Sequence, residues 1–165
     1  MTFSMISPLS SYDDQISNDH AFQAWEAIRR AQRVRWDAAH TQRWRADFRR
    51  HVAEARNRIV AHHQASRAPG SPVTRFLATA GSEARLLREH LAEHRWLRER
   101  LNELVQAVES RSAATFEDVV ELTERAIFLE IQLARHQNRF RGLLRQSASP
   151  SPTVLTAGAT QSASR

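Results

Sequence analysis

The chain contains no cysteine and no lysine, and it has little glycine or proline. Without cysteine, the chain cannot form disulfides, use a catalytic thiolate or bind zinc through sulfur. Its 165 residues include 4 glycines and 5 prolines, and no proline lies between Pro8 and Pro69. Alternating runs of β-branched and aromatic residues, which are typical of strands, are also missing. The composition therefore predicts an all-α protein.

Long apolar runs are absent as well. No stretch approaches the roughly 20 apolar residues that a membrane-spanning helix needs. Residues 1–15 show no basic region followed by an apolar stretch, so we expect no secretory signal. These features predict a cytoplasmic protein that makes no contact with a membrane.

The charge is strongly basic, with a net value of +6, and all 24 basic residues are arginine. Eight arginines fall between Arg29 and Arg50, against only three acidic residues in the vicinity. Such a density attracts phosphates, so one hypothesis is an Arg-rich binder of nucleic acid or of an acidic partner. No nucleic-acid-binding motif accompanies the charge. We therefore favour a solvated helix face whose arginine stems cover apolar surface.

The chain divides into three parts. Residues 1–14 are expected to be a flexible leader, and residues 147–165, rich in Ser, Ala, Thr and Pro, a disordered tail. Between them, in residues 15–146, apolar residues recur in steps of three and four along four segments. This pattern predicts an up-down-up-down four-helix bundle with disordered termini. A long helical hairpin that dimerises through the same apolar stripes is the alternative.

The expected helices cover residues 17–36 and 41–66, a segment from Ser71 to residue 108, and a last segment from residue 115. Ser71 followed by proline suits the start of the third helix, and Thr115 with Asp118 has the form of a capping box. No glycine or proline marks the break near residues 37–41. A continuous helix over residues 17–66 therefore stays open as an alternative.

One histidine lies on or beside the apolar stripe of each expected helix: His20, His62, His94 and His136. A buried imidazole must be hydrogen-bonded, protonated against a partner or bound to a metal. The midpoint between His20 and His62 is residue 41, at the expected turn, so these two histidines lie at the same height in an antiparallel helix pair. His94 and His136 are offset along the bundle axis by about one to two helical turns. His62 and His94 lie at the same height only if the third helix starts late. The four histidines could therefore converge on one interior site, or they could be four unrelated residues of the core.

The segments VAEARNRIVAHHQASRAPG, LLREHLAEHRWLRERLNEL and LEIQLARHQNRFRGLLRQ resemble the hemerythrin-like family over about residues 17–146. The resemblance implies a four-helix bundle that holds two irons. It places metal ligands at His20, at His62 or the adjacent His63, at His94 and at His136. His90 lies four residues before His94, on the same helix face, and supports that ligand set.

The sequence departs from the family at the carboxylates that bridge the two irons. Members of the family have an acidic residue four positions after the histidine of the second helix, where this chain has Ser66 or Arg67. They have a second acidic residue four or five positions after the histidine of the fourth helix, where this chain has Phe140 and Arg141. Iron prefers mixed nitrogen and oxygen ligands, so a working two-iron centre is not expected.

We therefore predict a degenerate two-iron site without a resident cofactor. The expected role is non-enzymatic: an interaction or regulatory module with a protein partner, with a homodimer as one option. The first alternative is an atypical iron-binding protein that uses one histidine per helix. Haem held between helices by one of these histidines is a further option.

Overall fold

The computed structural model describes residues 19–69, 71, 73–74, 78, 84–111 and 114–148, with side chains to residue 142. The expected leader lies outside the described residues, as does the expected tail beyond residue 148. Within the described residues there are four long helices, one short 3-10 helix and no strand, which confirms the all-α prediction. They are α2 (His20–Gln32), η1 (Ala38–His40), α3 (Thr41–Arg67), α5 (Ala84–Glu109) and α6 (Phe116–Ala148).

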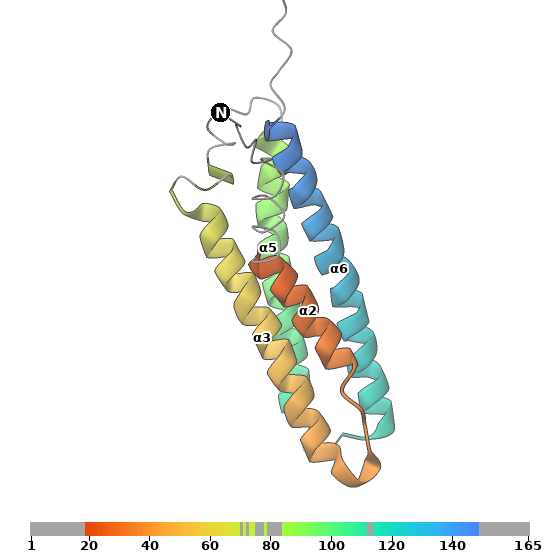
Figure 1. Cartoon of the computed structure of the whole chain (residues 1–165). Coiled ribbons are helices and arrows are strands. Elements are labelled where there is room, and N and C mark those ends of the chain that lie inside the picture. The colour runs from red at the N-terminus through yellow and green to blue at the C-terminus, as the bar shows by residue number, and fades with distance from the viewer. Residues whose placement is uncertain are drawn as a thin grey trace, which may run out of the picture.

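The four long helices form the predicted up-down-up-down bundle. Helix α2 packs on α3, α3 on α5, α5 on α6, and α6 on α2, and successive helices run in opposite directions (Figure 1). Helix α2 has 13 residues, about 20 Å, whereas α6 has 33 residues, about 50 Å. The short helix α2 therefore lies against only part of the length of its neighbours. Among the described helices, none combines the length and apolar character needed to cross a bilayer.

The break between the first two helices is confirmed, so the alternative of one continuous helix is wrong. Helix α2 ends at Gln32, before the expected residue 36, because Val34 and Trp36 leave the helix and pack against the core. The Asp37 carboxylate then accepts a hydrogen bond from the Ala39 amide at 2.9 Å. An Asp side chain that caps a turn in this way replaces the glycine or proline that the sequence lacks here.

The predicted helix starts at Ser71 and Thr115 are present, but the long helix of the third segment, expected from Ser71 to residue 108, is described only from Ala84, as α5. Ser71 Oγ accepts a hydrogen bond from the Thr74 amide at 3.1 Å, and residues 73, 74 and 78 are helical. Thr115 Oγ1 accepts from the Asp118 amide at 3.2 Å, while the Asp118 carboxylate accepts from the Thr115 amide at 3.0 Å. This reciprocal pair is the predicted capping box, and it opens α6.

The core is interrupted by a polar layer. The main apolar cluster includes Phe48, Ile59, Leu97 and Leu133, and a smaller one contains Val73 and Leu87. Four buried histidines lie between these clusters in sequence along α3, α5 and α6. All four tryptophans belong to the main cluster: Trp44 is buried, and Trp25, Trp36 and Trp96 lie partly buried against it. The polar layer is therefore the feature of the core that packing alone does not explain.

Candidate metal centre

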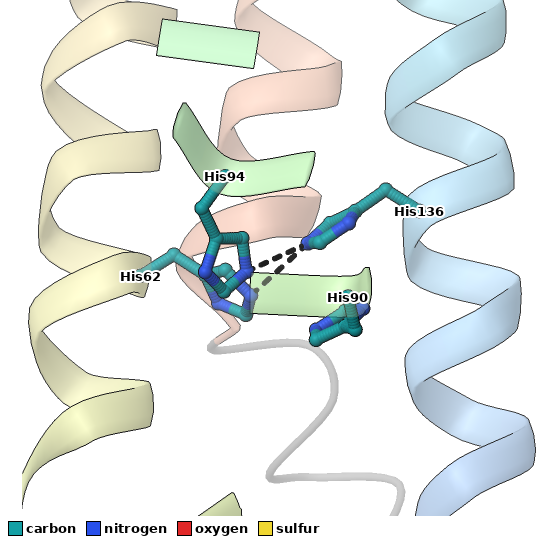
Figure 2. Close-up of side chains that lie close together, drawn as sticks. All are labelled: His62, His90, His94 and His136. Atoms are coloured by element: carbon teal, nitrogen blue, oxygen red, sulfur yellow. Dashed lines mark hydrogen bonds between the residues drawn. The ribbon is translucent and has the colours of Figure 1, made fainter. Parts of the chain in front are cut away.

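The polar layer brings together four histidines from three helices, which we call the histidine cluster: His62 on α3, His90 and His94 on α5, and His136 on α6 (Figure 2). None is more than 4% exposed. One nitrogen from each residue lies within 4.8 Å of the corresponding nitrogens of the others, so the cluster could hold a metal ion. The sequence proposed all four as ligands.

Each histidine occupies a helical position at which an apolar residue is expected. His62 follows Ile59 on the buried stripe of α3, and His136 follows Leu133 on that of α6. His90 and His94 are one helical turn apart, so they share one face of α5. The apolar neighbours along each stripe fix the rotation of the helices and thereby aim the imidazoles inward.

Three of the rings point their Nε2 atoms toward one another (Figure 2). His136 Nε2 lies 3.0 Å from His94 Nε2 and 3.4 Å from His62 Nε2. A tetrahedral ion with metal–nitrogen distances of about 2.0–2.1 Å separates its nitrogen ligands by about 3.3–3.4 Å. The 3.4 Å separation matches this value and the 3.0 Å separation is slightly shorter, so His136 Nε2 lies about as far from each of the other two nitrogens as a fellow ligand of one ion would.

Carboxylates hold the outer nitrogens of two of these rings. Asp19 Oδ1 accepts a hydrogen bond from His62 Nδ1 at 2.9 Å, and Glu93 Oε2 accepts one from His136 Nδ1 at 3.0 Å. Arg139 pairs with the other oxygen of Glu93. In metal sites, carboxylates in this position fix the imidazole tautomer and direct the lone pair of the opposite nitrogen at the ion. Here they direct Nε2 of His62 and His136 into the cluster.

The charge of Asp19 is maintained despite its partial burial. Burial by itself would raise the pKa of the Asp19 carboxyl. The hydrogen bond and the charge interaction with His62, together with the Ala21 amide, outweigh this effect and lower its pKa. The carboxylate is therefore ionised at neutral pH, as a strong acceptor must be.

The inner nitrogens cannot all be satisfied by hydrogen bonds within the cluster. His94 Nε2 can donate one proton to His136 Nε2, but the Nε2 lone pair of His62 then has no donor, given the tautomers inferred above. A cation satisfies all three lone pairs at once. His94 would then carry its proton on Nδ1, where His63 Nδ1 lies 3.1 Å away and can accept it.

Three imidazoles of the cluster, those of His90, His94 and His136, are uncharged at neutral pH. Burial is the main cause that lowers the pKa of His90 and of His136 to about 3, and charge repulsion between neighbouring imidazoles adds to it. The same two causes also lower the pKa of His94. Neutral imidazole is the form that binds metal, so these rings need not release protons to do so.

His90 differs from the other three. Its ring stacks on that of His136, with centroids 4.2 Å apart and planes 4° apart. Both of its ring nitrogens are buried and have no hydrogen-bond partner among the described residues. A metal lies in the plane of each ring that binds it, so parallel stacked rings cannot share one ion. His90 therefore lies beside the place where the other three histidines could hold an ion, and it would bind that ion directly only after its ring rotates.

The structure does not bring His20 into the cluster. His20 is the first residue of α2, and the residue before it, Asp19, contacts His62 instead. Among the acidic residues next to the cluster histidines on α5 and α6, Glu93 contacts His136 as an outer partner. Glu89 pairs with Arg85 at 3.3 Å, and Glu130 with Arg29 at 3.4 Å.

The positions of the family's bridging carboxylates hold other groups. Ser66 Oγ donates to the main-chain oxygen of His62 at 2.8 Å, and the Phe140 ring stacks on His90. The inner nitrogens of the cluster thus face one another rather than a carboxylate. Comparison with protein-family models, with curated proteins and with solved structures finds no match to this chain.

Proposed function

We propose that this helical bundle binds one divalent transition-metal ion through Nε2 of His62, His94 and His136. The convergence of these three nitrogens carries the proposal, because their separations of 3.0 and 3.4 Å suit one tetrahedral ion. The carboxylates of Asp19 and Glu93 support it, since they leave the inner nitrogens as lone-pair donors.

Zinc is the ion that this ligand set favours. The inner donors are imidazole nitrogens, which suit zinc, copper, nickel and iron, and tetrahedral spacing is typical of zinc. Three protein ligands leave a fourth position, and His90 lies beside it with two unpartnered nitrogens. His90, after rotation, or a water hydrogen-bonded to it would complete the coordination.

Iron is the second candidate, because the sequence resembles hemerythrin-like proteins. The residues fit one ion and not two, since Ser66 and Phe140 replace the bridging carboxylates. In this proposal the chain is a degenerate relative of that family which keeps a single-ion site. A non-enzymatic role, in which the ion stabilises an interaction or regulatory module, agrees with the deep burial of all four histidines.

Metal titration of the 165-residue chain, first treated with a chelator to remove bound metal, tests the proposal. We expect one equivalent of zinc to bind, in competition with a chromophoric chelator, and to raise the thermal midpoint. At a free zinc concentration about 100 times Kd, the gain in unfolding free energy is about 2.7 kcal/mol. Iron(II), titrated without oxygen, is the parallel arm.

Two variants make the titration specific. His94→Ala removes a proposed ligand and should abolish stoichiometric binding, whereas His51→Ala removes a histidine outside the cluster and should preserve it. Binding of less than about one tenth of an equivalent of every metal tried, with an unchanged thermal midpoint, would overturn the proposal. Equal binding by the two variants would place the ion elsewhere.

A further inference from the structure

A pocket lies where α2 gives way to α3, at the start of α3, whereas His62 of the histidine cluster lies near the other end of that helix. Figure 1 shows the bend of the chain between α2 and α3, which we call the elbow. The volume of the pocket is about 960 Å³. Five arginines line it: Arg30, Arg33, Arg35, Arg43 and Arg50. These residues belong to the arginine-rich segment noted in the sequence, and the elbow gathers them around one space.

The positive charge of this pocket is only partly neutralised. Its lining contains two aspartates against the five arginines. Asp47 is shared between Arg50 at 3.1 Å and Arg43 at 4.0 Å. Among the described residues, no carboxylate lies within ion-pair distance of the exposed side chains of Arg33 and Arg35. Two guanidinium groups are thus available to a ligand.

The backbone adds to the positive potential. Helix α3 has 27 residues, its first turn contains no acidic residue and it receives no side-chain cap from His40, while the Asp37 carboxylate caps the preceding turn η1. The start of such a helix carries a partial positive charge and favours anions. The indole nitrogen of Trp36, also in the pocket lining, is buried and has no hydrogen-bond partner among the residues that the structure describes. Positive charge therefore exceeds negative charge in this pocket.

We propose that the elbow pocket binds a small organic polyphosphate of nucleotide size. Guanidinium groups bind phosphate oxygens in paired hydrogen bonds, which suits Arg33, Arg35 and Arg43. Val34 and the half-buried Trp36 give the pocket an apolar side for the organic part. The volume lies within the range of about 300–1,000 Å³ that is typical of small-molecule sites.

The aromatic residues favour a small ligand over a single-stranded nucleic acid. Binding of single strands relies on exposed rings on which successive bases stack. Trp44 is only 3% exposed and stacks on Phe48, so it cannot serve as such a ring. Trp36 is the only tryptophan of the lining that remains partly accessible.

Calorimetric titration of the metal-free protein with ATP, and separately with pyrophosphate, tests this proposal. Metal is removed first because polyphosphates themselves bind divalent ions. We expect ATP to bind with one-to-one stoichiometry, and pyrophosphate to compete with it. The double variant Arg33→Ala/Arg35→Ala should weaken ATP binding by about tenfold or more at about 50 mM salt.

The matched control is Arg88→Ala/Arg98→Ala, which removes the same charge from exposed positions on α5 and should change the affinity less than about twofold. Equal losses in both double variants would reduce the effect to net charge and overturn the proposal. No ATP binding at low salt would do the same. A random single-stranded oligonucleotide that binds about 100-fold more tightly than ATP would make the pocket a nucleic-acid surface instead. His94→Ala should bind ATP normally, so this result is independent of the metal site.

Discussion

Asp19 offers the sharpest test of how the cluster is built, because one carboxylate serves two structures. Its Oδ1 atom accepts the Ala21 amide at 3.0 Å, which caps α2, and accepts His62 Nδ1 at 2.9 Å. Three substitutions separate these roles. Asp19→Asn keeps both hydrogen bonds without the charge, Asp19→Ser keeps only the cap, and Asp19→Ala keeps neither.

The expected losses of unfolding free energy follow from these bonds. A helix cap is worth about 1 kcal/mol, and a hydrogen bond to a charged group about 1.5–3 kcal/mol. For the chelated protein, we therefore expect losses of about 1 kcal/mol in Asp19→Asn, about 2 kcal/mol in Asp19→Ser and about 3 kcal/mol in Asp19→Ala. In a domain of this size, 1 kcal/mol corresponds to a shift of the thermal midpoint of roughly 3–5 °C.

Zinc affinity should follow a different order from stability. Loss of an outer partner of a metal-binding histidine weakens metal binding by about 10–100-fold. Asp19→Ser and Asp19→Ala both lose the His62 contact, so we expect equal losses of zinc affinity although their stabilities differ by the cap. Urea denaturation and competitive zinc titration measure the two quantities. Wild-type zinc affinity in Asp19→Ser would refute the role given to this carboxylate.

Three further outcomes follow from the same geometry. In the folded protein the pKa of His136 is about 3, below its value of about 6.5 in an unfolded chain. The unfolded state therefore binds more protons between these two pH values. The metal-free protein should accordingly lose stability as pH falls from about 6.5 toward 3. Urea denaturation at several pH values measures this slope, and His136→Leu should reduce it while the contributions of His90 and His94 remain. His90→Leu, which removes two unpartnered nitrogens, should leave the stability of the chelated protein unchanged or raise it; a loss above about 2 kcal/mol by the same assay would contradict this expectation. Thr115→Ala should lower the unfolding free energy by about 1 kcal/mol through loss of the capping box, while Thr115→Ser, the control, should not.

Much of the fold could be predicted because its helices are strongly amphipathic. The segment expected over residues 41–66 is α3, Thr41–Arg67, and the stripe from Trp44 to Ile59 is buried throughout. The exact end of α2 could not be predicted in the same way. Residues 33–37 leave the helix through contacts of Val34 and Trp36 with the core, and those contacts depend on the neighbouring helices.

The candidate site was predictable in its histidines and not in its carboxylates. His62 and His136 stand at seam positions where leucine is expected, so the periodicity alone places them inside. Adjacent helical residues differ by about 100° around the axis. Whether Asp19 or His20 faces His62 therefore depends on the rotation of a short helix at its first turn. The contact between Glu93 and His136 likewise depends on how α5 and α6 are rotated against each other.

The double use of Asp19 has a kinetic consequence. The first turn of a helix opens far more often than the whole protein unfolds, since few contacts hold it. Opening of this turn releases the partner of His62 as well as the Ala21 amide. We therefore expect a bound ion to exchange with solvent at the rate of local opening of α2, and to slow hydrogen exchange in that turn. The bundle would then lose its ion without losing its fold.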